Sequence, residues 1–168
     1  MVKHRPVARM GASQMIALDE IDHAIIKCLK EDARMSSLEM TRRMGAVSDR
    51  VVRYRIKRLL DNKVVLLNAI VSPFAVGYPI IADILVEVAP WKLREVSAKL
   101  AAMPPVCYVS SAYAGRHLSI EVNACDEHEV MDFVHRRLRH IDGVVKTQTM
   151  IVPHVIKDVM DWEIPSRS

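Results

Sequence analysis

The chain has 168 residues, of which 51% are hydrophobic and 5% aromatic, and its formal net charge is +4 at pH 7. This length is enough for one ordinary domain or two small ones with a buried core, and the few aromatic residues argue against a stacking platform for single-stranded nucleic acid. No apolar run is long enough to span a membrane and the N-terminus lacks the apolar core of a signal peptide, so we expect a cytoplasmic protein without a membrane partner.

The charge is distributed unevenly along the chain. Residues 1–63 carry 14 Lys and Arg against 8 Asp and Glu, whereas residues 64–168 carry 10 against 12. This asymmetry predicts that only the first part of the chain meets a polyanion. The cysteines Cys28, Cys107 and Cys125 are scattered and form no C-x-x-C motif, which indicates a reducing compartment and neither a disulfide framework nor a zinc site. We therefore expect no cofactor and no metal.

The first segments are a polar tail and a helix. Residues 1–17 are basic and have no apolar period, so we predict a flexible basic tail, with an arm that touches DNA phosphates as the alternative. Residues 18–30 are predicted to form a helix, because Asp19 can cap its N-terminus and Asp22 suits the positive helix end. Its inner stripe is expected to hold Ile21, Ile25, Cys28 and Leu29.

A short second helix is predicted over residues 36–44. Ser36 and Glu39 have the spacing of a capping box, and Gly45 ends the helix because glycine takes positive φ without strain. The apolar residues Leu38, Met40 and Met44 are expected to face inward.

The third predicted helix, over residues 48–62, has two unlike faces. Ser48 is expected to cap it, and the apolar face consists of Val52, Ile56, Leu59 and Leu60. The opposite face is basic and consists of Arg50, Arg53, Tyr54 and Lys57. A basic helix face is often only solvated, but the capped helix and glycine turn before it predict a helix-turn-helix domain over residues 18–64.

A strand and a linker are predicted over residues 65–79. Residues 63–71 form an apolar, β-branched run that is typical of a strand. Ser72-Pro73 and Gly77-Tyr78-Pro79 then break the chain, which places the domain boundary here.

The second half repeats strand and helix patterns. Strands are expected over residues 80–88, 106–113, 118–123 and 144–152, with helices over residues 92–102 and 126–139. This β-α-β-β-α-β order predicts a ferredoxin-like domain over residues 80–152, followed by a C-terminal tail over residues 153–168. The fold class is thus α+β, a winged helix-turn-helix followed by a ferredoxin-like domain. A second copy of the chain is expected to cover the sheet face that the helices leave open.

Residues 18–160 resemble the Lrp/AsnC family of bacterial and archaeal regulators. The resemblance rests on L-D-x-I-D at Leu18–Asp22, R-x-R-I-K-R-L at Arg53–Leu59 and S-P-F-A-V-G-Y at Ser72–Tyr78. It implies a transcriptional regulator whose second domain forms dimers through its sheet, assembles the dimers further, and often binds an amino acid or another small effector.

Two segments depart from the family pattern. The turn at residues 45–48 is one residue longer than usual, which tilts the recognition helix or shifts its register in the groove. In the loop where family members often carry Gly and then Asp at the effector site, this chain has no carboxylate after Gly115. Arg116 and His117 attract a carboxylate or phosphate instead. We place the expected effector site at Tyr113, Gly115, Arg116 and His117; the alternative is that this loop senses no ligand.

Double-stranded DNA is the expected partner of the first domain. Arg50, Arg53 and Tyr54 are candidates for base contacts, because Arg can bond guanine O6 and N7 together. The expected DNA-binding surface comprises Ser48, Arg50, Arg53, Tyr54, Lys57, Arg42 and Arg43. Arg55 and Arg58 contact phosphates or support the fold, with acids such as Asp61 as partners.

Two alternative functions differ from a sequence-specific regulator. An architectural protein would coat DNA through the same helix with little base selectivity. Sirohaem decarboxylases are similar to this family, but they carry a motif of the form H-N-Y-x-R-x-H-x-Y-N-L-W. Tyr113, Arg116 and His117 do not reproduce that spacing, and we expect no enzyme.

Overall fold

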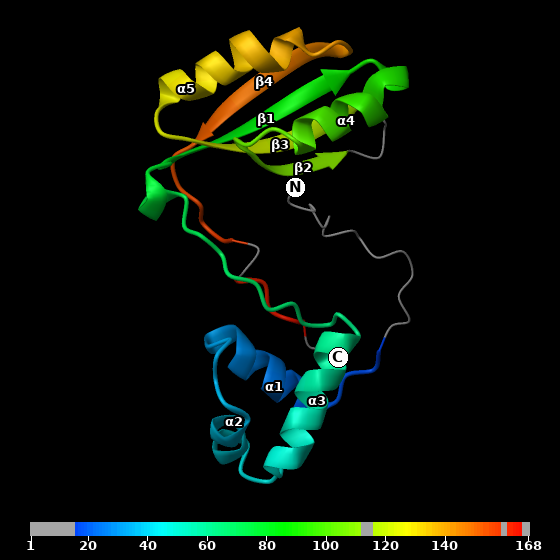
Figure 1. Ribbon diagram of the computed structural model, residues 1–168, viewed down its shortest axis with the longest axis vertical. Helices are drawn as coiled ribbons and strands as arrows, with labels where there is room; N and C mark the ends of the chain where they lie inside the picture. Colours follow the sequence, from blue (N-terminus) through cyan, green and yellow to red (C-terminus); the bar gives the residue numbers. More distant parts are fainter. Residues whose placement is uncertain (1–15, 112–115, 159–160, 166–168) are drawn as a thin grey trace. The chain divides into compact units, whose positions relative to one another are not determined.

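The computed structural model describes residues 16–111, 116–158 and 161–165. The chain divides into two compact units, residues 1–69 and residues 70–168, whose elements are labelled in Figure 1. Residues 1–15 of the expected tail lie outside the described residues. Among the helices of the described ranges, none is long and apolar enough to cross a membrane.

The first unit contains helices α1 (Glu20–Glu31), α2 (Ser37–Met44) and α3 (Asp49–Asp61). All three predicted N-caps are confirmed: Asp19 forms a capping box with Asp22, Ser36 accepts the N–H of Glu39, and Ser48 accepts the N–H of Val51. Gly45 ends α2 with φ +73°, a conformation that side chains other than glycine rarely adopt. The helix-turn-helix therefore follows from local capping and turn chemistry.

Apolar side chains from all three helices form the core of this unit. Ile25 on α1, Met40 on α2 and Leu59 on α3 are almost completely buried, as is Val52. The prediction that Leu38 faces inward was wrong, because its side chain is 51% exposed. Leu38 precedes Met40 by two residues, and positions two apart lie on nearly opposite sides of a helix.

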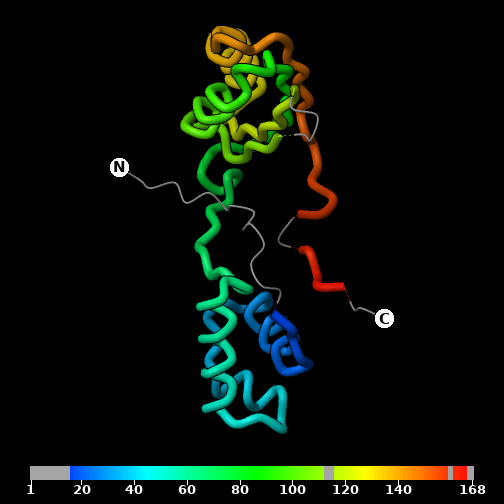
Figure 2. Tube along the Cα trace, turned by 90° about the vertical axis from the view of Figure 1, so that its right-hand side faces the viewer, coloured from blue at the N-terminus to red at the C-terminus, as the bar shows by residue number. Residues whose placement is uncertain are grey.

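The strand expected over residues 63–71 is not formed. The chain follows an irregular path from α3 to the 3₁₀ turn η1 (Phe74–Val76) and then enters β1 (Figure 2). Its apolar side chains are exposed, as in Leu66, Leu67, Ile70 and Val71. Apolar composition alone does not make a strand, because a ladder needs hydrogen bonds to a neighbouring strand, and none of the described strands pairs with this segment.

The second unit is built on one antiparallel sheet. Its strands are β1 (Ile80–Val88), β2 (Val106–Ser111), β3 (His117–Ala124) and β4 (Val144–Val152), in the order β2-β3-β1-β4. On central strand β1, Ile84 is opposite Ile120 of β3 and Thr149 of β4. This order and direction confirm the predicted ferredoxin-like topology, and the α+β fold class with it.

Helices cover one face of this sheet. After the 3₁₀ turn η2 (Pro90–Lys92), helix α4 (Leu93–Ala101) packs Val96 and Leu100 against the same core as the second helical segment. That segment comprises α5 (Glu127–Asp132), the π-helix η3 (Phe133–Arg137) and the 3₁₀ turn η4 (Leu138–His140). The predicted helix over residues 126–139 is therefore present, but only its first part is α-helical. It continues as a π-helix and ends as a 3₁₀ turn.

Among the described residues, no helix covers the other face of the sheet. Residues of β1 alternate, so Val86 is buried under the helices whereas Leu85 is exposed on the opposite side. Glu87, Ser119 and Met150 lie on the same open face by register. The open face of the sheet therefore carries both apolar side chains, such as Leu85 and Met150, and polar or charged ones, such as Ser119 and Glu87.

Candidate nucleic-acid interface

Helix α3 has one face in the core and one face outside it. Val52 and Leu59 are buried, whereas Tyr54 is 65% exposed. Arg50, Arg53 and Lys57 are exposed as well. The exposed face thus combines cationic and hydroxyl hydrogen-bond donors on a helix anchored by its apolar side, which is suited to contact with nucleic acid.

Asp49, in the first turn of α3, connects two parts of this surface. Its carboxylate accepts a hydrogen bond from the Ser37 hydroxyl at 2.5 Å and forms an ion pair with Arg53. The Arg53 side chain is 69% exposed, so this pair does not withdraw it from the surface. The guanidinium therefore remains available for contact with a partner.

Arg55 and Arg58 contact helix α1. Arg55 pairs with Asp19 at 2.6 Å and with Asp22 at 3.2 Å, and Arg58 pairs with Asp22 at 2.5 Å. The prediction that these arginines pair with acidic residues is confirmed, but the example Asp61 was wrong, because Asp61 pairs with Lys57 at 2.5 Å. These two arginines therefore hold α3 against α1.

Asp22 is the buried charge of this cluster. Its side chain is fully buried, yet both its oxygens accept hydrogen bonds from Arg55. The backbone N–H of Asp22 and the guanidinium of Arg55 also hold the pKa of Asp19 below its usual value. The sequence predicted Asp22 only as a carboxylate that favours the positive end of its helix. The pair Arg55 and Arg58, three residues apart on α3, was the signal that could have predicted its buried ion pairs.

The candidate phosphate contacts take part in exposed ion pairs. Arg43 pairs with Glu31 at 2.8 Å and with Glu39 at 3.2 Å, while Arg42 lies 3.7 Å from Glu39. Exposed pairs of this kind contribute about 0–1 kcal/mol. Phosphates can replace such carboxylates at little cost, so the pairs are compatible with DNA contact. Within the described ranges, Arg50 has no ion pair.

The expected effector loop is described only at its end. Tyr113 and Gly115 lie outside the described residues. Arg116 is exposed and lies 3.8 Å from Glu87, and its carbonyl accepts the N–H of Val88 at 2.8 Å. His117 begins β3. The nearby carboxylate partly neutralises Arg116, which weakens but does not remove its attraction for anions.

Possible metal ligands do not cluster in the described ranges, where no group of three or more His, Cys, Asp and Glu side chains could hold an ion.

Comparison with known protein families shows two matching domains in sequence. Residues 18–60 match the AsnC-type helix-turn-helix domain, and residues 67–163 match a C-terminal dimeric alpha+beta barrel domain of the AsnC type. The second match covers more than half of the chain.

Similar proteins from archaea extend over nearly the whole chain. An uncharacterized HTH-type transcriptional regulator of Pyrococcus abyssi is 35% identical over 150 residues, covering 89% of this chain and 94% of the relative. The HTH-type transcriptional regulator FL11 of Pyrococcus furiosus is 32% identical over 148 residues, covering 88% and 97%. Both relatives are named as regulators.

Solved structures share the fold. A transcriptional regulator of Neisseria meningitidis in complex with L-Met is 25% identical with a TM-score of 0.79, covering 88% of this chain and 97% of that chain. AsnC of E. coli is 20% identical with a TM-score of 0.78, covering 86% and 99%, and supports the fold alone. The two matched domains and the full-length relatives show that this protein is a transcriptional regulator of the Lrp/AsnC family.

Proposed function

We propose that this regulator recognises particular double-stranded DNA sequences by inserting α3 into the major groove. In this proposal Arg50, Arg53 and Tyr54 contact base edges, while Ser48, Lys57, Arg42 and Arg43 contact the backbone. The observation that carries it is the exposed basic face of α3, whose opposite face is fastened by buried Val52 and Leu59.

Oligomerisation and an effector complete the proposal. The matched C-terminal domain is of a dimeric type, and a homodimer places two α3 helices about one DNA turn apart or a multiple of it, which favours a near-palindromic site. One relative was solved with L-Met. For this chain we propose that a small molecule with an anionic group binds Arg116 and His117, together with Tyr113 and Gly115.

The test is binding of the full chain to the DNA upstream of its own gene, measured by fluorescence anisotropy across a salt series. An unrelated duplex of the same length is measured in parallel, with the variants Arg53→Ala and Arg94→Ala. Arg94 is an exposed arginine on α4 and serves as a charge-matched control. We expect affinity to fall with salt and Arg53→Ala to reduce the preference for the specific duplex about 5- to 150-fold.

The outcomes separate the candidate functions. Equal affinity for both duplexes, with Arg53→Ala lowering both alike, indicates an architectural protein. Absence of binding at low salt contradicts any role of α3 on DNA. A loss with Arg94→Ala equal to that with Arg53→Ala shows that total charge matters and the position on α3 does not.

A further inference from the structure

A row of charged side chains runs along one side of α3. Four residues spaced four apart make up this charged row: Asp49, Arg53, Lys57 and Asp61. Residues at this spacing are neighbours on a helix, and the row forms two ion pairs, Asp49 with Arg53 and Asp61 with Lys57. The two cations thus lie in the middle of the row, and each has its carboxylate on the side of the nearer helix end.

The two carboxylates of the charged row are held differently. The Asp49 side chain is 29% exposed, and its second oxygen accepts the hydroxyl of Ser37, on the preceding helix α2, at 2.5 Å. The Asp61 side chain is 60% exposed, and its contact in the described part of the chain is with Lys57 on the same helix. The positive end of the helix dipole favours Asp49, whereas the negative end disfavours Asp61. Asp49 is therefore the more firmly held carboxylate.

A carboxylate held from α2 limits the orientations of Arg53. The Oδ2 atom of Asp49 binds the Nη2 atom of Arg53, while its Oδ1 atom binds Ser37, so this arrangement spans both helices of the helix-turn-helix. A guanidinium has five N–H donors, and one bond to Asp49 leaves enough of them for guanine O6 and N7. An arginine that is oriented before binding loses less conformational entropy when it contacts a base.

The negative charge of Asp49 has a second effect, on DNA of any sequence. The cations of this face attract phosphates without regard to sequence, and a carboxylate beside them is repelled by the same phosphates. The repulsion lowers the affinity for every duplex alike. The orientation of Arg53, in contrast, favours only a duplex that presents a guanine to it, and so it raises the preference for that duplex.

We propose that Asp49 determines the sequence specificity of this regulator: anchored by Ser37, it orients Arg53 toward a guanine, and its charge opposes binding to unmatched DNA. Asp49 is a positioning residue, because it acts on the base through Arg53. This role rests on the proposed function, in which Arg53 contacts base edges.

A purely structural role of Asp49 predicts a different result. A carboxylate in the first turn stabilises a helix through its dipole, although Ser48 already caps α3. If Asp49 served only to stabilise the helix, its loss would lower the affinity for all duplexes together. The proposed role predicts instead that the affinity for unmatched DNA rises while the preference for the specific duplex falls.

The test measures binding of the full chain to the duplex from upstream of its own gene and to an unrelated duplex of the same length, by fluorescence anisotropy at one salt concentration. The variants are Asp49→Asn, Ser37→Ala and Asp61→Asn. Asp61→Asn is the matched control, because it removes the same charge and breaks an ion pair of the same spacing at the other end of α3. Urea unfolding of each variant shows that the first unit is folded.

We expect Asp49→Asn to raise the affinity for the unrelated duplex about two- to fivefold and to lower the preference for the specific duplex at least about threefold. Ser37→Ala keeps the charge of Asp49, so it should lower the preference about twofold and leave the affinity for the unrelated duplex unchanged. Asp61→Asn should raise both affinities alike and leave the preference unchanged.

The variant Arg53→Ala shows whether Asp49 acts through Arg53. In this background Asp49→Asn should no longer change the preference, because the side chain that Asp49 orients is absent. The proposal is overturned if Asp49→Asn lowers both affinities alike, if it leaves the preference of the otherwise wild-type protein unchanged, or if its effect on the preference persists without Arg53. Equal preference of the wild-type protein and Arg53→Ala contradicts the proposed function and this role together, whereas an unchanged preference in Asp49→Asn alone contradicts only this role.

Discussion

At the scale of single residues, Asp22 shows how a buried charge orients the DNA-contacting helix. It lies at the start of α1 and is bonded to Arg55 and Arg58 of α3. A buried carboxylate is tolerated only when its partners replace the water it loses. The same carboxylate also closes the capping box with Asp19, so one side chain caps α1 and fixes α3 against it.

Replacement of Asp22 by Asn is therefore expected to destabilise the first unit by about 3 kcal/mol, because two guanidiniums lose a buried counter-charge. Urea unfolding followed by circular dichroism measures this. Asp61→Asn is the control, since it breaks only the exposed pair with Lys57 and should change stability by about 0–1 kcal/mol. Equal effects of the two substitutions would contradict the structural role of Asp22.

Lys92 and Glu95 give the second unit a stability that depends on pH. Lys92 lies 2.8 Å from both Glu95 and Asp142, and Glu95 also pairs with Lys99 at 2.8 Å. These lysines, Lys92 first, lower the pKa of Glu95 from 4.5 to about 2. A lowered pKa in the folded state means that the contribution is present above the unfolded value and is lost as the carboxylate becomes protonated.

The melting temperature of Glu95→Gln should thus lie below that of the wild-type protein at pH 7, and the difference should disappear between about pH 4.5 and about pH 2. Thermal melts at several pH values measure it. Glu127→Gln, at an exposed carboxylate in the first turn of α5, is the control. A difference in melting temperature that grows as the pH falls would contradict a stabilising role of the ionised Glu95.

At the scale of elements, the turn into β4 depends on a close approach that only glycine allows. Gly143 has φ +98°, and an added Cβ would lie 2.5 Å from the Cβ of Lys92. Gly77, after η1, has φ +93°, but an added Cβ would meet no atom within 4 Å. A side chain at position 77 therefore introduces backbone strain alone, whereas a side chain at position 143 introduces backbone strain and a steric collision.

Gly77→Ala should cost about 1–2 kcal/mol, since the left-handed backbone conformation strains any side chain. Gly143→Ala should cost more, because η2 and the turn before β4 must move apart as well. Chemical denaturation of both variants gives the comparison. Similar losses of stability in the two variants would show that the Lys92 side chain moves aside at little energetic cost.

At the scale of the whole molecule, the open face of the sheet is the expected meeting surface of two chains. Leu85 on central strand β1 is 39% exposed there, and Met150 of β4 is 49% exposed. The matched domain is of a dimeric type. A charge placed at the centre of such an interface loses its hydration without gaining a partner.

Leu85→Glu should therefore raise the dimer dissociation constant about tenfold or more, as measured by sedimentation equilibrium. Met131→Glu is the matched control, because Met131 is exposed on α5 and not on the sheet. Unchanged association of Leu85→Glu, or equal loss in both variants, would place the dimer interface elsewhere.

Local chemistry accounts for what could be predicted from the residues alone. The capping positions Asp19, Ser36 and Ser48 and the stop at Gly45 depend on neighbours a few residues away. The order of strands and helices along the chain followed from apolar, β-branched runs and chain breaks. The family motifs at Leu18–Asp22 and Arg53–Leu59 are local as well. The three helices, the ferredoxin-like topology and the family were thus accessible before any coordinates.

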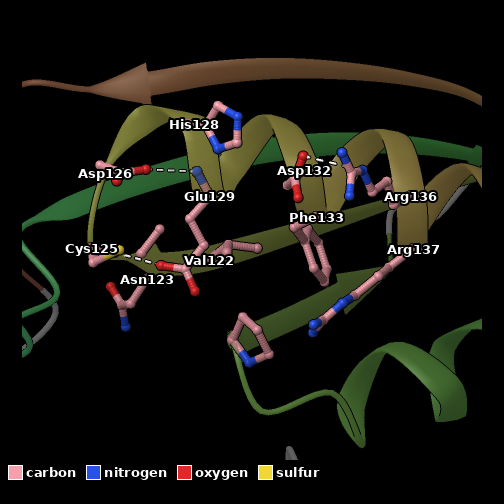
Figure 3. Close-up of a pocket in the computed structure, with 12 residues that line it drawn as sticks. Val122, Asn123, Cys125, Asp126, His128, Glu129, Asp132, Phe133, Arg136 and Arg137 are labelled. Atoms are coloured by element: carbon pink, nitrogen blue, oxygen red, sulfur yellow. Dashed lines mark hydrogen bonds and ion pairs between the residues drawn. The ribbon is translucent and has the colours of Figure 1, made fainter.

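Contacts between distant segments decided the rest. Asp22 became buried because α3 brings Arg55 and Arg58 against it, more than 30 residues later. Residues 63–71 pair with none of the described strands, and without a partner an apolar run forms no ladder. The cavity at the C-terminal end of β3 brings Asn123 of β3 together with Glu129 of α5 and Arg137 of η3 (Figure 3). Burial and pairing of this kind depend on packing in three dimensions, which periodicity along the chain does not encode.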